Sequence, residues 1–271
     1  MKKEIFLRQF PKELEYEASR LYNSFEIAKE YEVAAYTEEF YTPNFWKRLT
    51  GKMEGIYIFT SGCFEESDRR QIAFIPAIYC EEGAISGNSR SEMPDFLKFP
   101  YGLLKIQINS KFKEYSHKDF LGSLMGLNIK RELMGDLILE KDRGYIPVSD
   151  KIKNVILKEL VQIGNAPCKV TDVNEEMEVI PSYKYDDKII TVPSKRLDSL
   201  VSAITGLSRT KVTEPIEKGK VLVDYFEEKE KSKIVETGSL ITIRGYGKFR
   251  LVSDRGETKK GKERLLIKKY I

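Results

Sequence analysis

Histidine and cysteine are scarce in this sequence. Its 271 residues include one histidine, His117, and three cysteines, Cys63, Cys80 and Cys168. The cysteines are odd in number, widely spaced and outside any Cys-x-x-Cys motif, which argues against a disulfide framework and against a zinc site. Any histidine-dependent catalysis would have to rest on His117 alone. We therefore expect free thiols, no metal, no cofactor and no catalytic residues.

Long hydrophobic runs are absent as well. No apolar stretch approaches the roughly 20 residues that a membrane-spanning helix needs. The N-terminus, from Met1 to Phe6, lacks the apolar core of a signal peptide. With 41% hydrophobic and 32% charged residues, the composition is that of a globular protein. We expect a cytoplasmic protein without membrane association.

Positive charge is concentrated near the C-terminus. Residues 194–271 contain 19 Lys and Arg against 11 Asp and Glu, a net charge of +8, whereas residues 1–193 contain 27 against 31, a net charge of −4. A polyanion would bind the basic third of the chain most readily. The distribution therefore favours nucleic acid as a partner.

Residues 1–95 are expected to form an N-terminal α/β domain. Apolar residues at helical spacing predict a helix over 11–31, and β-rich runs predict strands at 55–60 and 72–79. The loop between the strands contains Asp68-Arg69-Arg70, a candidate for phosphate contact.

Residues 96–185 show the periodicity of a second domain. The predicted elements are a strand at 104–108, a helix capped by Ser116, strands at 136–140 and 145–148, a helix capped by Ser149 and ended by Gly164, and a strand at 168–173. Their order, βαββαβ, is that of the ferredoxin-like plait. RRM domains share this plait, but their aromatic RNP pattern is missing here, since the first strand presents Lys105, Gln107 and Asn109. RNA contact by this domain would use backbone or shape.

Residues 186–271 have the pattern of two short helices followed by strands. Ser194 and Ser208 can cap the helices, Gly206 can end the first, and alternation predicts strands at 221–225 and 241–243. The motifs are Arg196-Leu197-Asp198, Leu207-Ser208-Arg209, Gly219-x-Val221-x-Val223 and Val235-x-x-Gly238. This segment resembles the S4 RNA-binding domain, which implies a helix pair on a small sheet that docks on folded RNA.

The candidate RNA-binding residues lie in this basic segment. Some occupy first turns of the predicted helices, where the helix dipole favours phosphate, and others lie on the hairpins and the basic tail that follow. They are Lys195, Arg196, Ser208, Arg209, Lys211, Lys218, Lys220, Arg244, Lys248, Arg250, Lys259, Lys260 and Lys262.

Three local features qualify this interpretation. Pro215 lies inside the second helix and predicts a short or kinked helix. Asp224-Tyr225 replaces the usual turn residues, which predicts a longer turn through the charged stretch 227–233. The string Arg196-Leu197-Asp198 also occurs in pseudouridine synthases, where the aspartate is catalytic, but here we expect Asp198 to brace Arg196 or the start of the helix.

Two further segments resemble the bacterial YlmH family. They are His117-Lys-Asp-Phe-Leu-Gly122 and Gly126 to Asp136, to which the Thr258-Lys-Lys-Gly261 tail is added. The resemblance implies a cytoplasmic RNA-binding protein linked with the ribosome, and genomically with cell-division genes. The family is similar to smaller S4 proteins that bind the large ribosomal subunit during rescue of stalled nascent chains.

The favoured interpretation is a non-catalytic, monomeric protein that binds structured RNA. The partner would be rRNA or tRNA, on the large ribosomal subunit or on a tRNA-bearing complex in ribosome quality control. Two alternatives stay open. One is an RNA-modifying enzyme with its active site in residues 1–185 and the S4 segment as its targeting module. The other is an adaptor protein for cell division.

Overall fold

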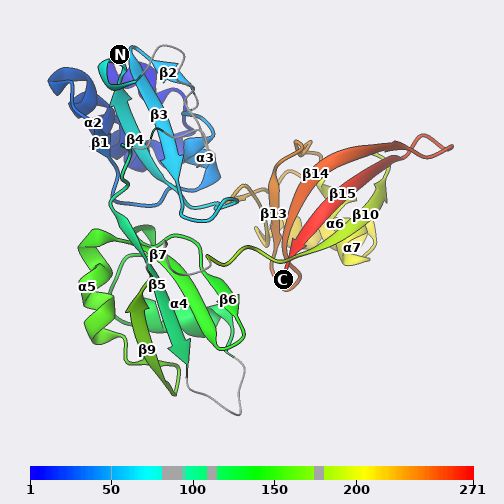
Figure 1. The fold of residues 1–271 in the computed structure, drawn as a ribbon. Helices are drawn as coiled ribbons and strands as arrows, with labels where there is room; N and C mark the ends of the chain where they lie inside the picture. Colours follow the sequence, from blue (N-terminus) through cyan, green and yellow to red (C-terminus); the bar gives the residue numbers. More distant parts are fainter. Residues whose placement is uncertain (50, 81–93, 95, 109–114, 174–179) are drawn as a thin grey trace. The chain divides into compact units, whose positions relative to one another are not determined.

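The computed structural model describes residues 1–49, 51–80, 94, 96–108, 115–173 and 180–271. The chain is mixed α+β and divides into two compact units, residues 1–182 and residues 183–271 (Figure 1). Within the described ranges, no helix is both long and apolar enough to cross a membrane. The first unit holds two of the antiparallel sheets, so the boundary predicted near residue 95 separates two sheets inside one unit.

The N-terminal sheet has the strand order β1-β4-β3-β2. Helix α2 packs on it through Ala18, Leu21 and Phe25, which are all buried. The predicted helix and the two predicted strands are therefore present. The elements are α1 (Lys3–Leu7), η1 (Lys12–Leu14), α2 (Glu15–Tyr31), β1 (Ala35–Tyr36), α3 (Pro43–Trp46), β2 (Lys52–Met53), β3 (Ile56–Ser61), β4 (Gln71–Pro76) and η2 (Ala77–Tyr79).

The phosphate contact suggested for Asp68-Arg69-Arg70 is wrong for its two buried members. Arg70 is 8% exposed; its Nε donates to the carbonyl of Ser67 at 2.8 Å and its guanidinium lies 4.7 Å from the Trp46 ring centroid. Asp68 is buried too, and its backbone carbonyl accepts from the Trp46 indole at 2.8 Å. Asp68 and Arg70 are thus held in the interior of the unit, whereas Arg69 is half-buried.

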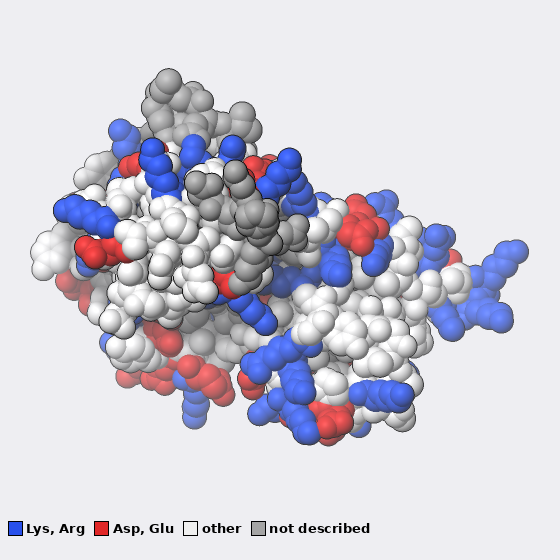
Figure 2. All heavy atoms as spheres, turned by 90° about the horizontal axis from the view of Figure 1, so that it is seen from below, with Lys and Arg blue, Asp and Glu red and all other residues white. Residues whose placement is uncertain are grey.

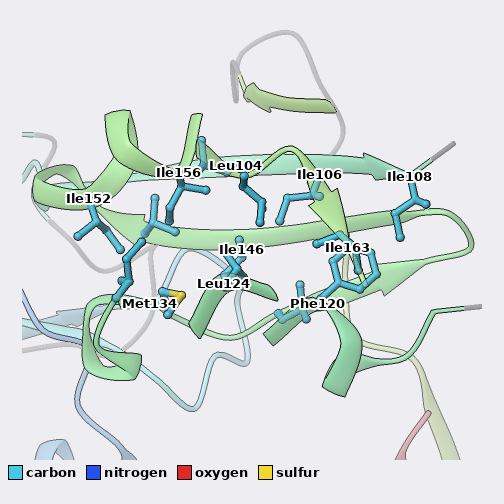
Figure 3. Packing of buried hydrophobic residues seen from close by; sticks show 14 of the residues in the cluster. Leu104, Ile106, Ile108, Phe120, Leu124, Met134, Ile146, Ile152, Ile156 and Ile163 are labelled. Atoms are coloured by element: carbon cyan, nitrogen blue, oxygen red, sulfur yellow. The ribbon is translucent and has the colours of Figure 1, made fainter. Parts of the chain in front are cut away.

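The central sheet has the strand order β6-β7-β5-β9-β8 and is antiparallel throughout. Its core is formed between the sheet and two helices by Leu104, Ile106, Phe120, Ile146 and Ile156 together with their neighbours (Figure 3). The elements are β5 (Tyr101–Ile108), α4 (His117–Met125), η4 (Arg131–Leu133), β6 (Ile138–Glu140), β7 (Arg143–Ser149), α5 (Asp150–Glu159), β8 (Gln162–Ile163) and β9 (Ala166–Asp172).

Both helix starts in this domain follow the sequence. Ser116 caps α4 in a capping box with Asp119, and the Ser149 hydroxyl accepts from the backbone N–H of Lys151. The predicted helix end is wrong, because α5 finishes at Glu159. Gly164, at φ 55°, instead forms the turn of the small β8–β9 hairpin, a position that requires a left-handed backbone. Asn109 lies outside the described residues.

Gly144 is a position where a side chain has no room. A Cβ built there would lie 2.6 Å from Cε1 of Phe120, which is fully buried. We expect Gly144→Ala to lower the free energy of unfolding by about 1–3 kcal/mol through overpacking. Gly122→Ala, in α4 with no atom within 4 Å of the new Cβ, should instead raise it by about 0.5–1 kcal/mol. Urea denaturation of both variants tests the contrast, and equal effects would contradict it.

The C-terminal sheet has the strand order β10-β15-β14-β13-β11-β12. One of its faces is covered by the two helices, with Leu200, Val212, Ile241, Leu251 and Ile267 in the core between them. The elements are β10 (Tyr185–Val192), α6 (Leu197–Thr205), α7 (Arg209–Glu217), β11 (Val221–Val223), β12 (Phe226–Glu227), β13 (Leu240–Ile243), β14 (Gly247–Glu257) and β15 (Glu263–Tyr270).

Two details of this unit differ from the expectations. The N-cap of α6 is Arg196, not Ser194, because the backbone is still extended at Arg196 and the helix begins only at Leu197. The turn after β11 is tight, since Asp224 and Tyr225 adopt φ angles of 47° and 73° and let β12 pair directly with β11. The predicted long turn is therefore wrong. Pro215 lies within α7, which spans nine residues and continues past it to Glu217.

Candidate nucleic-acid interface

Two arginines from neighbouring helices meet on one carboxylate. Arg196, at the start of α6, donates from Nε and Nη2 to the two carboxylate oxygens of Asp198, both at 3.2 Å. Arg209, the first residue of α7, donates from Nη2 to Asp198 Oδ2 at 2.7 Å. The sequence predicted the first of these contacts. The second joins residues 11 positions apart and depends on how the helices pack.

Asp198 is the buried centre of this arrangement. Its side chain is 9% exposed, whereas the side chains of Arg196 and Arg209 are 37% and 50% exposed. Burial opposes ionisation, but hydrogen bonds and charge from the two guanidiniums outweigh it and hold the pKa of the Asp198 carboxyl below its usual value. The carboxylate therefore stays ionised and fixes both guanidiniums with their outer edges toward solvent.

The start of α6 offers an anion fewer backbone donors than its sequence implied. The N–H groups of Leu197 and Asp198 donate to the carbonyls of Lys233 and Lys231 at 2.8 and 3.0 Å. Phosphate contact at this helix must therefore come from side chains. The same contact brings the exposed residues Lys231 and Lys233 beside Arg196. The charged stretch 227–233, which the sequence predicted as part of a longer turn, thus returns to α6, a tertiary feature that no local pattern indicated.

The start of α7 agrees with the prediction. The Ser208 hydroxyl accepts from the backbone N–H of Lys211 at 3.4 Å, and the Lys211 side chain is exposed. Later in the helix, Lys218 pairs with Glu214 at 2.6 Å, and both side chains are exposed. Lys220 is exposed just beyond the helix. Arg209 and Lys211 therefore lie at the positive N-terminal end of the α7 dipole, whereas Lys218 and Lys220 lie at its C-terminal end.

The other predicted residues lie apart from the arginine pair. Lys195 faces Asp254 and Glu263 at 3.6 and 3.8 Å. Arg244 lies 3.8 Å from Glu227. The tip of the β14–β15 hairpin carries Lys259, Lys260 and Lys262, all exposed, and blue side chains crowd the outer end of this hairpin in Figure 2. Lys248 and Arg250 lie on the sheet face that the helices leave uncovered.

The residues of the first unit that could suggest catalysis have structural contacts. The Nε2 atom of His117 is 3.0 Å from the carbonyl oxygen of Leu137. Asp136 is buried, and its Oδ2 accepts from the backbone N–H groups of Asp68 and Arg69 at 2.7 and 3.0 Å. Within the described part of the chain, no group of three or more His, Cys, Asp or Glu residues is placed to hold a metal ion.

Comparisons with known proteins also indicate RNA, but through a segment that does not include Arg196 and Arg209. Residues 94–177 match the family model described as "Putative RNA-binding domain in YlmH". A curated relative, the ribosome-associated protein quality control protein P2 of Bacillus subtilis (strain 168), is 28% identical over 176 residues, which are 65% of this chain and 68% of the relative.

A match among solved structures is the cell division protein ylmH from Streptococcus pneumoniae. Its TM-score is 0.48 at 18% identity, covering 63% of this chain and 97% of that one. The family match and the curated relative confirm the resemblance to the YlmH family predicted from the sequence, and the family match covers the central part of the chain, residues 94–177.

Proposed function

We propose that this protein binds structured RNA on the large ribosomal subunit, or on a ribosomal complex that carries tRNA, and acts there without catalysis in the cytoplasm as a monomer. The observation that supports this most is the convergence of Arg196 and Arg209 on Asp198. Two oriented guanidiniums can grip adjacent phosphates of a folded RNA backbone. The relative named for ribosome-associated quality control supports the choice of ribosomal RNA over other RNA.

We infer the finer fold assignments from topology. The order β6-β7-β5-β9 places β5 and β7, the first and third strands of the βαββαβ segment, next to each other in the middle of the sheet, as in a ferredoxin-like plait. In the second unit, the pair α6 and α7 lies on one face of the sheet that contains β11 and β13, which supports an S4-type domain. The central domain would then add shape-dependent contacts to the grip of the second unit.

Co-sedimentation with purified ribosomal subunits tests the proposal. The full chain is expected to travel with the large subunit at low salt and to leave it as salt rises, because phosphate contacts release counterions. The small subunit and a protein-only pellet serve as controls. Recovery of the chain in the supernatant with both subunits at low salt would contradict the proposal.

The hairpin tip should contribute charge without selectivity. Lys259, Lys260 and Lys262 are exposed on a turn between β14 and β15. Replacing all three with alanine is expected to reduce the slope of log K against log salt by about 2–3, since each phosphate contact contributes roughly 0.7–0.9. Preference among RNAs should stay nearly unchanged. Fluorescence anisotropy at several salt concentrations measures the slope, and an unaltered slope would show that the tip does not contact RNA.

A further inference from the structure

The face of the C-terminal sheet that α6 and α7 do not cover carries tyrosines and cations in register. Side chains of paired residues in an antiparallel sheet project to the same side. The pairs Tyr185–Tyr270 and Arg250–Lys268 therefore share a face. Lys248 lies on the same face because it precedes Arg250 by two residues in β14. The residues between them, such as Phe249 and Ile267, are buried in the core beneath the helices. The surface formed by Tyr185, Tyr225, Lys248, Arg250, Lys268 and Tyr270 is called the tyrosine face.

Contacts within the tyrosine face hold rings and cations together. Tyr185 and Tyr270 meet edge to face with centroids 5.0 Å apart. Lys268 Nζ lies 4.7 Å from the Tyr185 centroid, and Arg250 donates to the Tyr270 hydroxyl at 2.6 and 3.0 Å. The array is ordered before any ligand arrives, which lowers the entropy cost of binding.

The neighbouring turn extends the same surface. Tyr225 occupies the second position of the tight turn after β11, at φ 73°. Its hydroxyl accepts from Lys248 Nζ at 2.9 Å, and that ammonium lies 5.0 Å from the Tyr225 centroid and 5.9 Å from the Tyr270 centroid. Lys248 thus joins two tyrosines into one row. All six side chains are half-buried, so each keeps part of its surface in contact with solvent.

Charge and shape on this face match unpaired nucleotides. Cations interleaved with aromatic rings bind single-stranded nucleic acid, because bases stack on the rings and the cations contact the backbone. The face carries Lys248, Arg250 and Lys268, while Asp187 lies across from Lys268 on the edge strand β10. The same face carries the exposed Ile189 and the half-buried Leu266, but the row from Tyr225 to Tyr185 consists of polar-tipped rings and cations, which favour RNA over an apolar protein or membrane surface.

We propose that the tyrosine face is a second RNA-binding surface, which stacks unpaired bases while the Arg196–Asp198–Arg209 cluster grips structured backbone. This rests on the proposed function and adds a substrate class to it. Rings Tyr185 and Tyr270 supply stacking, and Lys248, Arg250 and Lys268 contact the phosphates between the bases. The protein would then recognise a junction where a folded RNA continues into a single strand.

The test uses two labelled RNAs and the full chain. One probe is a 12-nucleotide oligouridylate, which has no secondary structure, and the other is a blunt 12-base-pair RNA duplex. Tyr185→Leu with Tyr270→Leu keeps apolar bulk but removes the rings, and is expected to weaken oligouridylate binding by about 10-fold or more. Duplex binding should change less than about 2-fold. Circular dichroism and thermal melting check that this variant, and the phenylalanine control described below, are folded.

A matched variant separates ring stacking from the hydroxyl contacts. Tyr185→Phe with Tyr270→Phe keeps the rings and should bind oligouridylate within about 2-fold of the natural protein. Unchanged oligouridylate binding by the leucine variant, or equal losses for the leucine and phenylalanine variants, would overturn the inference. Duplex binding without oligouridylate binding by the natural protein would also overturn it but leave the proposed function standing. Binding of neither RNA would overturn the inference as well, while co-sedimentation with the large subunit still decides the proposed function.

Discussion

Arg196→Gln combined with Arg209→Gln is expected to lower affinity for the large ribosomal subunit by about 100-fold or more. Each guanidinium can make charge-assisted hydrogen bonds worth roughly 1.5–3 kcal/mol to a phosphate. Glutamine is preferred to alanine because its amide can still donate to the buried carboxylate of Asp198. Alanine at both positions would leave that charge unpaired, which typically costs about 3–5 kcal/mol.

Two further variants separate the effect of guanidinium geometry from that of positive charge in general. Lysine at both positions keeps the charge but loses the planar fork, and we expect an intermediate loss of about 10-fold. Arg8→Ala with Lys12→Ala removes two exposed cations from the N-terminal segment and should bind within about 2-fold of the natural protein. Co-sedimentation and circular dichroism are the measurements. A folded glutamine variant that binds normally would move the principal RNA contact away from α6 and α7.

Asp198→Asn is expected to weaken RNA binding even though it makes the protein more positive. Simple electrostatics predicts tighter binding when a carboxylate leaves an RNA-binding face. The geometry instead predicts that the affinity for RNA falls by about 5- to 20-fold. Asp198 orients Arg196 and Arg209, and a neutral amide binds guanidiniums less strongly than a carboxylate does. Glu236→Gln, which removes an exposed negative charge from the same unit, is the matched control and should leave binding unchanged or slightly tighter. Fluorescence anisotropy titrations with the RNA duplex show whether Asp198→Asn binds RNA more weakly, as the geometry predicts, or more tightly, as net charge alone predicts.

The same carboxylate should make stability depend on pH. The pKa of Asp198 in the folded protein lies below its usual value because two arginines stabilise the charged form. Its contribution to stability is therefore fully present above the unfolded pKa of about 3.9, and is lost as pH falls through the folded pKa. We expect the natural protein to exceed Asp198→Asn in stability by about 1–3 kcal/mol at neutral pH. The difference should be constant down to about pH 5 and should shrink below about pH 4.

Urea denaturation from pH 7 to pH 3 measures this difference. The Glu236→Gln variant again serves as the control, since an exposed carboxylate should give a small difference at every pH. A stability difference that stays the same from pH 7 to pH 3 would show that the ionised carboxylate of Asp198 does not carry the interaction.

Local sequence signals were sufficient where a short segment determines its own structure. Ser116, Ser149 and Ser208 cap helices as predicted, because a hydroxyl at the N-cap satisfies nearby backbone donors. Gly206 ends α6 in the left-handed conformation, at φ 74°. Alternation located β5, β11 and β13, since one side of each strand had to be buried.

The errors occurred where longer-range packing competed with a local signal. Ser194 could cap a helix, but pairing of β10 with β15 keeps the chain extended through Val192 and the helix begins after Arg196. Gly164 could end a helix, yet the pairing of β8 with β9 uses it as a turn. At the turn after β11, Asp224 tolerates a positive φ, and its side chain accepts from the backbone N–H of Leu240 at 3.0 Å.

By itself, the sequence predicted the kind of partner and the part of the chain expected to meet it. The excess of Lys and Arg after residue 194, the scarcity of His and Cys, and the motifs around Arg196 and Arg209 are properties of composition and spacing, which need no tertiary contact to be recognised. Only the tertiary structure decided which of these cations act together. Asp198 and Arg209 meet because α6 and α7 pack side by side, and Tyr185 meets Tyr270 because the first and last strands of the unit pair. Contacts between distant residues depend on packing and strand register, and neither is encoded within a single segment.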